Sequence, residues 1–114
     1  MGLRFLNVST TLPDMQLARK IALLLTEKKL AASVQMIGPI ESHFWWKDKL
    51  EEAREWLCLI KTTEDAYPQV EALIVEEHPY EVPEIYAVPL ETGYPPYLAW
   101  VHRYSHAESF EEET

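Results

Sequence analysis

The side chains that could do chemistry in this sequence gather around one histidine. His78 is followed by Pro79, and three carboxylates lie close to it in the sequence, those of Glu77, Glu81 and Glu84. An imidazole nitrogen with carboxylate oxygens could bind a hard divalent ion. A structural role is the alternative, because a cation is favoured at the end of a helix and His78 could cap the helix that precedes it. The residue types and their spacing leave both roles open.

Two further groups could act as ligands or as a nucleophile. His102 and His106 are four residues apart, and on a helix they would share a face with a spacing that can chelate zinc or nickel. They fall at the frayed end of a short predicted helix, which weakens that interpretation. Cys58 is the only cysteine, so the chain has no internal disulfide. It lies in an apolar run and is expected to be an inert core thiol.

An acid–base enzyme would need His78 to work with Glu81 or Glu84. The sequence adds no activated nucleophile, no oxyanion donor and no three-ligand zinc motif to that pair. We therefore expect a binding protein and not an enzyme.

Composition and charge narrow the class of protein. A length of 114 residues, with 47% apolar and 25% charged side chains, suits one soluble globular domain over residues 1–114. The formal net charge of −9, without a basic stripe, argues against nucleic-acid binding. The apolar runs are too short to cross a bilayer, and residues 1–6 lack a signal-peptide layout. Together with the single cysteine, these features predict no membrane association and a cytoplasmic location.

The hydrophobic periodicity predicts four strands and three helices. Strands are expected over residues 3–10, 31–46, 50–62 and 82–90. Helices are expected over residues 14–29, 65–77 and 95–104, followed by a flexible acidic tail over 105–114. The order strand, helix, strand, strand, helix, strand is that of a split βαβ, ferredoxin-like domain. The predicted class is therefore α+β, with an antiparallel sheet, two helices on one face and a small extra helix at the C-terminal end.

The second and third strands are predicted to form one long hairpin. The segment 50–55 consists of good helix formers, so a short helix is the competing possibility there. We choose the hairpin, with Lys47–Lys49 as its turn. Gly38 and Pro39 should interrupt the ladder as a bulge or an edge feature. Two sets of residues each share one parity along the first arm: Val34, Met36, Ile40, Phe44 and Trp46, and Gln35, Glu41 and His43.

Capping residues and prolines set the expected boundaries. Thr11 or Asp14 can cap the first helix, and Asp65 can cap the second, which places Pro68 harmlessly in its first turn. Pro79 ends the second helix, because the residue before a proline is pushed out of the α region. Pro83 and Pro89 are expected at the two ends of the last strand, where a strand tolerates proline.

Four stretches of the sequence resemble the CutA family, the divalent-cation tolerance proteins. They are Glu-Lys-Lys-Leu-Ala-Ala at 27–32, Trp-Trp-Lys-Asp-Lys-Leu-Glu at 45–51, Leu-Ile-Lys-Thr at 59–62, and His-Pro-Tyr-Glu-Val-Pro-Glu-Ile at 78–85. The resemblance implies a ferredoxin-like subunit in a homotrimer similar to that of the PII signalling proteins, with strands pairing across subunits. It also implies a cytoplasmic protein linked to copper tolerance. Four tryptophans and six tyrosines are more than one small core readily hides, which agrees with an interface.

The resemblance also indicates where copper would bind. Copper-binding members use a cysteine just after the first strand and one or two histidines before the Pro-Tyr pair. Those positions are Thr10, Glu77 and His78 in this sequence, and a second family cysteine is replaced by Ser33. Copper(I) prefers thiolate and imidazole ligands, and of these positions only His78 keeps such a ligand. The cofactor that the resemblance implies is copper or another divalent cation.

Five more family-typical residues could converge on a cleft between subunits: Trp46, Lys49, Lys61, Tyr80 and Glu84. Such a cleft could bind a small anion or metabolite, or these side chains could simply hold the interface together. The first function hypothesis is therefore a homotrimer that binds divalent cations and takes part in metal tolerance. The second is a PII-like sensor or scaffold whose intersubunit clefts bind a small ligand or a partner protein.

Overall fold

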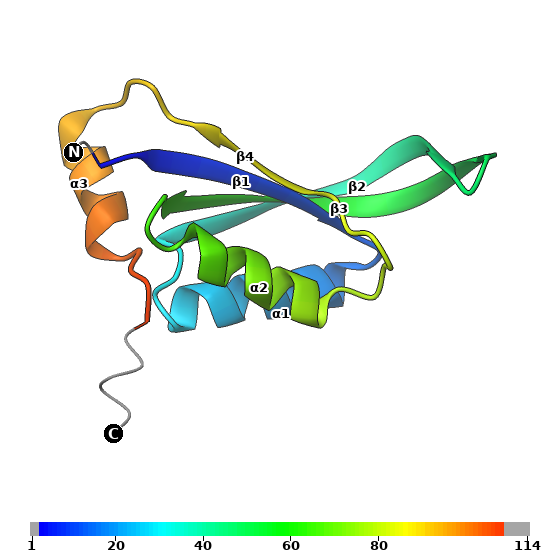
Figure 1. The fold of residues 1–114 in the computed structure, drawn as a ribbon, viewed down its shortest axis with the longest axis horizontal. Helices are drawn as coiled ribbons and strands as arrows, with labels where there is room; N and C mark the ends of the chain where they lie inside the picture. The colour runs from blue at the N-terminus through cyan, green and yellow to red at the C-terminus, as the bar shows by residue number, and fades with distance from the viewer. Residues whose placement is uncertain (1–2, 109–114) are drawn as a thin grey trace.

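The computed structural model describes residues 3–108 and contains one antiparallel sheet with helices on one face (Figure 1). The elements in order are β1 (Phe5–Leu12), α1 (Met15–Glu27), β2 (Ser33–Trp46), β3 (Lys49–Thr63), α2 (Tyr67–Glu77), β4 (Ile85–Pro89) and α3 (Pro95–Arg103). The strands lie in the order β2-β3-β1-β4. This confirms the predicted α+β, ferredoxin-like class with a long β2–β3 hairpin.

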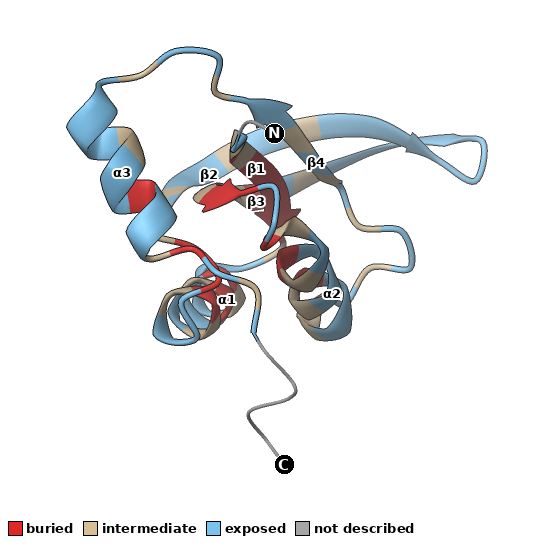
Figure 2. Cartoon of the chain, turned by 60° about the vertical axis from the view of Figure 1, so that its left-hand side comes forward, coloured by how far each residue is buried: buried red, intermediate tan, exposed pale blue. Residues whose placement is uncertain are grey.

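The core lies between the sheet and the two longer helices. α1 and α2 run side by side under one face of the sheet, and α3 lies at one end (Figure 1). Val8 of β1 and Ile60 of β3 are fully buried against Ile21 of α1 and Ile74 of α2. Buried residues lie along β1 and in the middle of the molecule, whereas the end of the β2–β3 hairpin that is far from the helices is exposed (Figure 2). None of the helices in the described part of the chain is long and apolar enough to cross a membrane.

Several element boundaries in the N-terminal half differ from the sequence prediction by one or two residues. β1 continues to Leu12, two residues further than predicted, because Thr11 and Leu12 still pair with β3. The capping residue of α1 is therefore Asp14, whose carboxylate accepts a hydrogen bond from the backbone N–H of Leu17 at 2.8 Å. Such a cap contributes about 1 kcal/mol to helix stability.

α2 begins two residues later than predicted. Its N-cap is Ala66, which makes no side-chain capping bond, and Pro68 lies in the first turn as expected. Asp65 has a different role, since its carboxylate accepts a hydrogen bond from the backbone N–H of Ala107 at 3.4 Å. Asp65 therefore bonds to the C-terminal segment and does not cap α2.

The β2–β3 hairpin contains the predicted interruption. Ile37 pairs with Leu57 and Ile40 pairs with Glu55, so Gly38 and Pro39 both lie opposite one residue of β3. Residues 50–55 are strand, because pairing along the whole hairpin overrides their helical propensity. The extra residue in β2 exchanges the two faces of the strand beyond the bulge.

This exchange decides which side chains lie together. Before the bulge, Val34 and Met36 face the helices and pack against the core. Beyond it, Glu41 and His43 take that face, while Phe44 and Trp46 point to the other side with Glu55. The even-numbered residues of β2 therefore do not share one face, although they share one parity in the sequence.

β4 is shorter than predicted. It spans Ile85–Pro89, so Pro83 lies outside the strand, and residues 78–84 form a loop between α2 and β4. Proline and the bends around it leave this segment without ladder partners, and it runs across the end of β1. We call residues 78–84 the α2–β4 loop.

The start of the predicted flexible tail is hydrogen-bonded. Ser105 is buried and its carbonyl accepts a bond from the Thr63 hydroxyl, and the His106 N–H donates to the Lys29 carbonyl at 2.9 Å. Glu108 N–H donates to the Gln69 side chain at 2.7 Å. Residues 109–114, the rest of the predicted tail, lie outside the described residues.

The space around two glycines, Gly38 in the bulge and Gly93 before α3, predicts how an alanine would be tolerated at each. A Cβ at Gly38 would overlap the indole of Trp56, whereas a Cβ at Gly93 would meet only the flexible end of Leu98 at 3.0 Å. We expect Gly38→Ala to lower the free energy of unfolding by about 1–3 kcal/mol, the usual cost of overpacking. Gly93→Ala is the matched control and should change it much less. Denaturant titration of both variants measures this, and equal losses would contradict the packing assigned to Trp56.

Candidate functional site

His78 is held by two hydrogen bonds within the protein. The side chain is 8% exposed. Its Nε2 donates to the backbone carbonyl of Thr11 at 2.7 Å, and its Nδ1 accepts from the backbone N–H of Tyr80 at 3.2 Å. His78 is the C-cap residue of α2, as considered, although neither side-chain bond goes to a carbonyl at the end of that helix. Its bonds instead fasten the α2–β4 loop to the end of β1.

The carboxylates predicted to join His78 in a metal site point to other partners. Glu77 forms an ion pair with Lys20 at 2.9 Å, Glu81 lies 3.8 Å from the ammonium of Lys47, and Glu84 is exposed. Within residues 3–108, no three ligand atoms that include His78 lie close enough together to hold an ion. Both ring nitrogens of His78 are also already bonded. The structure therefore does not bring this predicted set together.

The predicted replacement of the family cysteine lies in the core. Thr10 is fully buried and its hydroxyl has no hydrogen-bond partner in the described structure. It is paired across the strands with Cys58, which is also fully buried. Burial raises the pKa of the Cys58 thiol to about 11, so the thiolate that copper(I) prefers is disfavoured. This agrees with an inert thiol at position 58.

In the predicted metal-binding pair, His102 and His106, the second histidine is held by bonds within the protein. The rings of His102 and His106 lie 5.8 Å apart at the end of α3. Nε2 of His106 donates to the Arg103 carbonyl at 2.6 Å. These two residues join no third ligand in the described residues.

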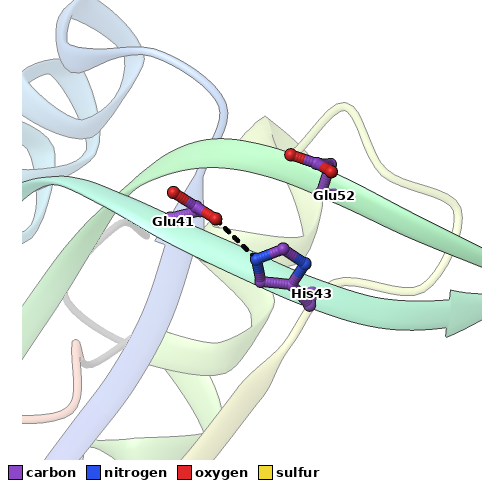
Figure 3. Close-up of side chains that lie close together, drawn as sticks. All are labelled: Glu41, His43 and Glu52. Atoms are coloured by element: carbon purple, nitrogen blue, oxygen red, sulfur yellow. Dashed lines mark hydrogen bonds and ion pairs between the residues drawn. The ribbon is translucent and has the colours of Figure 1, made fainter.

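A different group of ligands lies on the hairpin, and we call it the hairpin cluster: Glu41, His43 and Glu52 (Figure 3). One ligand atom from each lies within 4.8 Å of the others, and Nε2 of His43 is 2.6 Å from a carboxylate oxygen of Glu41. His43 and Glu52 are directly paired across the two strands, and Glu41 is two residues before His43 on the same face. All three side chains are exposed.

This geometry suits a divalent cation with nitrogen and oxygen ligands. The ligand atoms of a tetrahedral zinc ion lie roughly 3.4 Å apart, given metal–ligand bonds of about 2.1 Å. Small rotations of exposed side chains would bring the three atoms of the hairpin cluster to that separation. The remaining coordination positions would be open to water or to another ligand.

Sequence reasoning found only two members of the cluster. Glu41 and His43 were recognised as sharing a parity, but Glu52 belongs to the other strand. Placing it required the pairing register, which depends on the bulge at Gly38 and Pro39. The alternating spacing of Glu41 and His43 was the only signal in the sequence.

Three of the five residues predicted to converge on an intersubunit cleft line one cleft of the single subunit. Trp46, Tyr80 and Glu84 line a cleft of about 1060 Å³ between the hairpin and the α2–β4 loop. Lys49 and Lys61 are not among its lining residues. Lys61 instead donates to the side chain of Gln35 at 3.2 Å, and burial lowers the pKa of its ammonium group. We name this space the hairpin–loop cleft, defined by Phe44, Trp46, Glu55, Tyr80 and Glu81.

Glu55 is among the cleft residues that were not predicted. Glu55 is only 4% exposed, and its carboxylate accepts a hydrogen bond from the Tyr80 hydroxyl at 3.0 Å. Burial, followed by this bond and the negative charge of Glu55, raises the pKa of Tyr80 to about 12. Tyr80 therefore stays a hydrogen-bond donor over the physiological pH range and closes the loop against the hairpin.

The class of protein follows from this fold and from comparison with known proteins. The chain is a small ferredoxin-like domain with candidate cation ligands on a long hairpin. Residues 6–104 match the family model described as CutA1 divalent ion tolerance protein. The chain belongs to that family.

Curated relatives agree with this assignment. Over 99 residues the chain is 43% identical to "Protein CutA" of Mus musculus, covering 87% of this chain and 56% of the mouse protein. It therefore spans little more than half the length of that relative. It is 39% identical over 94 residues to the "Divalent-cation tolerance protein CutA" of Thermus thermophilus, covering 82% of this chain and 91% of the relative.

Solved structures show the same fold. The divalent cation tolerance protein of Thermus thermophilus superimposes with a TM-score of 0.87 at 37% identity, covering 89% of this chain and 98% of that one. CutA1 from Oryza sativa gives a TM-score of 0.87 at 33% identity, covering 94% and 97%. A relative from Archaeoglobus fulgidus, with a TM-score of 0.81 at 37% identity and covering 88% and 95%, is described as periplasmic.

The Tyr80–Glu55 bond predicts a pH effect. Because the pKa of Tyr80 is raised from 10.0 to about 12 in the folded protein, its contribution to stability is complete below pH 10 and is lost as the pH rises towards 12. The difference in unfolding free energy between wild type and Tyr80→Phe should therefore be constant below pH 10 and shrink above it. Chemical denaturation across this range measures the difference. The exposed Tyr94→Phe is the control, and a Tyr80 difference that does not change above pH 10 would contradict the bond.

Proposed function

We propose that this chain binds divalent cations and takes part in cation tolerance, and that it acts as a homotrimer. The observation that carries the proposal is the hairpin cluster of Glu41, His43 and Glu52. The family is named for divalent ion tolerance, which agrees with a cation as the ligand. Binding and release at an exposed site need no catalytic group, so we propose a binding protein and not an enzyme.

The chemistry of the cluster selects the kind of ion. Two carboxylates and one imidazole suit borderline divalent ions such as Zn²⁺, Ni²⁺ and Cu²⁺. Copper(I) would need soft sulfur ligands, and the single cysteine, Cys58, is buried and has a raised pKa. If this protein binds copper, we therefore propose that it binds Cu²⁺ at the hairpin cluster, in competition with Zn²⁺.

The trimer is proposed from the apolar surface that one subunit leaves uncovered. On the sheet face opposite α1 and α2, the side chains of Ile37, Tyr86 and Val88 are about half exposed. Trp45 and Leu50 of the hairpin are 71% and 64% exposed. Exposed apolar groups this numerous on two adjoining surfaces favour association with further copies of the chain.

We also propose a cytoplasmic location, on the basis of the single cysteine. The PII-like alternative, in which the protein senses a small ligand, is favoured by one observation. The hairpin–loop cleft has aromatic walls and a buried carboxylate, and these are features of a ligand site.

Metal titration separates the two candidate metal sites. In calorimetry with Zn²⁺ and Cu²⁺, we expect Glu41→Gln and His43→Ala to weaken binding by about ten-fold or more, since each removes a ligand. His102→Ala and Glu76→Gln remove the same groups elsewhere and should bind like wild type. His78→Ala should keep its metal affinity as long as it folds. Loss of binding in His78→Ala with full binding in His43→Ala would move the site to His78 and overturn the assignment.

Sedimentation tests the trimer. We expect a mass close to three times the 13.3 kDa subunit. Val88→Asp places a charge on the uncovered sheet face and should lower that mass, whereas Val75→Asp, on the outer face of α2 with similar exposure, should not. A wild-type mass equal to one subunit would refute the proposed assembly.

A further inference from the structure

Within residues 3–108, the buried carboxylate of Glu55 has no cationic partner. It is 4% exposed and accepts one hydrogen bond, from the Tyr80 hydroxyl. Among residues 3–108, none of the ion pairs formed by lysine, arginine or histidine side chains reaches it. An ionised carboxylate that is removed from water is costly unless a positive charge compensates it. Glu55 therefore points to a positively charged group that the subunit does not itself supply.

The surroundings of Glu55 suit an organic cation. The hairpin–loop cleft is lined by the aromatic rings of Phe44, Trp45, Trp46 and Tyr80 and by the carboxylates of Glu51, Glu52, Glu81 and Glu84. Aromatic faces attract ammonium groups through their quadrupoles. An anionic ligand would be repelled by so many carboxylates, and the described residues offer no three metal ligands that include Glu55.

The protein itself shows how an ammonium group lies at this cleft. The Nζ of Lys47, at the tip of the hairpin, is 5.5 Å from the centroid of the Trp46 ring and 3.8 Å from a carboxylate oxygen of Glu81. A primary ammonium on an alkyl chain is thus held between an indole and a carboxylate at the rim. Both charged groups are about 70% exposed, so this pair is weak and a ligand could displace it.

We propose that the hairpin–loop cleft binds a small aliphatic diamine or polyamine. One ammonium group pairs with Glu55, whose position is fixed by Tyr80. The alkyl chain lies against Phe44 and Trp46, and a second ammonium group is held by the carboxylates at the rim, among them Glu81. The ligand recognised is a flexible organic cation, distinct from the metal ion at the hairpin cluster.

The proposal does not depend on the metal site. Glu41 belongs to the hairpin cluster but does not line the cleft, whereas Glu55 lines the cleft but does not belong to the cluster. His43 and Glu52 reach both, so they are unsuitable for telling the two apart. Glu41→Gln should lose metal binding and keep amine binding, and Glu55→Gln should do the reverse.

Calorimetry with diaminobutane tests the proposal on the full chain at about 0.15 M salt, where attraction to the net negative charge alone is largely screened. We expect Glu55→Gln, which keeps an acceptor for Tyr80 but loses the charge, to bind about ten-fold or more weakly, since hydrogen-bonded charge pairs are strong. Glu76→Gln makes the same charge change on the surface of α2 and should bind like wild type. Butanediol, which has the same chain without charge, should not bind.

Two outcomes would overturn the proposal. One is a wild-type protein that does not bind diaminobutane at millimolar concentration. The other is equal affinity in wild type and Glu55→Gln. If Glu55→Gln fails to fold, Glu81→Gln is the second variant, because Glu81 is exposed at the rim; unchanged affinity in that variant would count against the site in the same way.

Discussion

The pairing of β2 with β3 across the bulge at Gly38 and Pro39 is the constraint on which the candidate sites depend. A strand alternates its side chains between two faces, so one extra residue moves every later side chain to the opposite face. This reversal puts Glu41 and His43 on the same face as Glu52, which is the hairpin cluster. It also turns Phe44 and Trp46 to the face of Glu55, where they form one wall of the hairpin–loop cleft. At this bulge a side chain in place of Gly38 would overlap the indole of Trp56.

The second wall of the cleft is placed by buried polar bonds. The α2–β4 loop has no ladder partners in the sheet. Its position comes from the bond of His78 to the Thr11 carbonyl and the bond of Tyr80 to the Glu55 carboxylate. Buried polar groups of this kind stabilise one arrangement strongly, because each would be costly if unpaired. A histidine that resembles a metal ligand in the sequence is thus used to fix the loop. Among the described residues, the three candidate metal ligands that come together, Glu41, His43 and Glu52, lie on the hairpin instead.

Much of the fold could be predicted because local patterns specify it, as the apolar spacing of α1 and its cap at Asp14 show. Residues 50–55 mark the limit of local propensity, since they favour a helix and become strand only through pairing with β2. The sites depend on contacts that are distant in the sequence and were therefore harder to predict. His78 was chosen for its chemistry, yet its role is decided by the carbonyl of Thr11, 67 residues away. Glu55 lies in a charged run of the sequence, yet it is only 4% exposed and accepts a hydrogen bond from Tyr80 of the α2–β4 loop.

Both proposed cation sites follow from the same excess of negative charge, and the hairpin keeps them chemically distinct. The hairpin cluster is exposed, and its ligands include an imidazole, which favours a metal ion that keeps some of its water. The hairpin–loop cleft has aromatic walls and a carboxylate removed from water, which favours an organic cation that is more easily dehydrated. His43 and Glu52 contribute to both surfaces, so a metal ion bound there would neutralise part of the field that attracts an amine. The two proposed sites are therefore coupled through shared charge, and each ligand would weaken the binding of the other to the same extent, because such coupling is reciprocal.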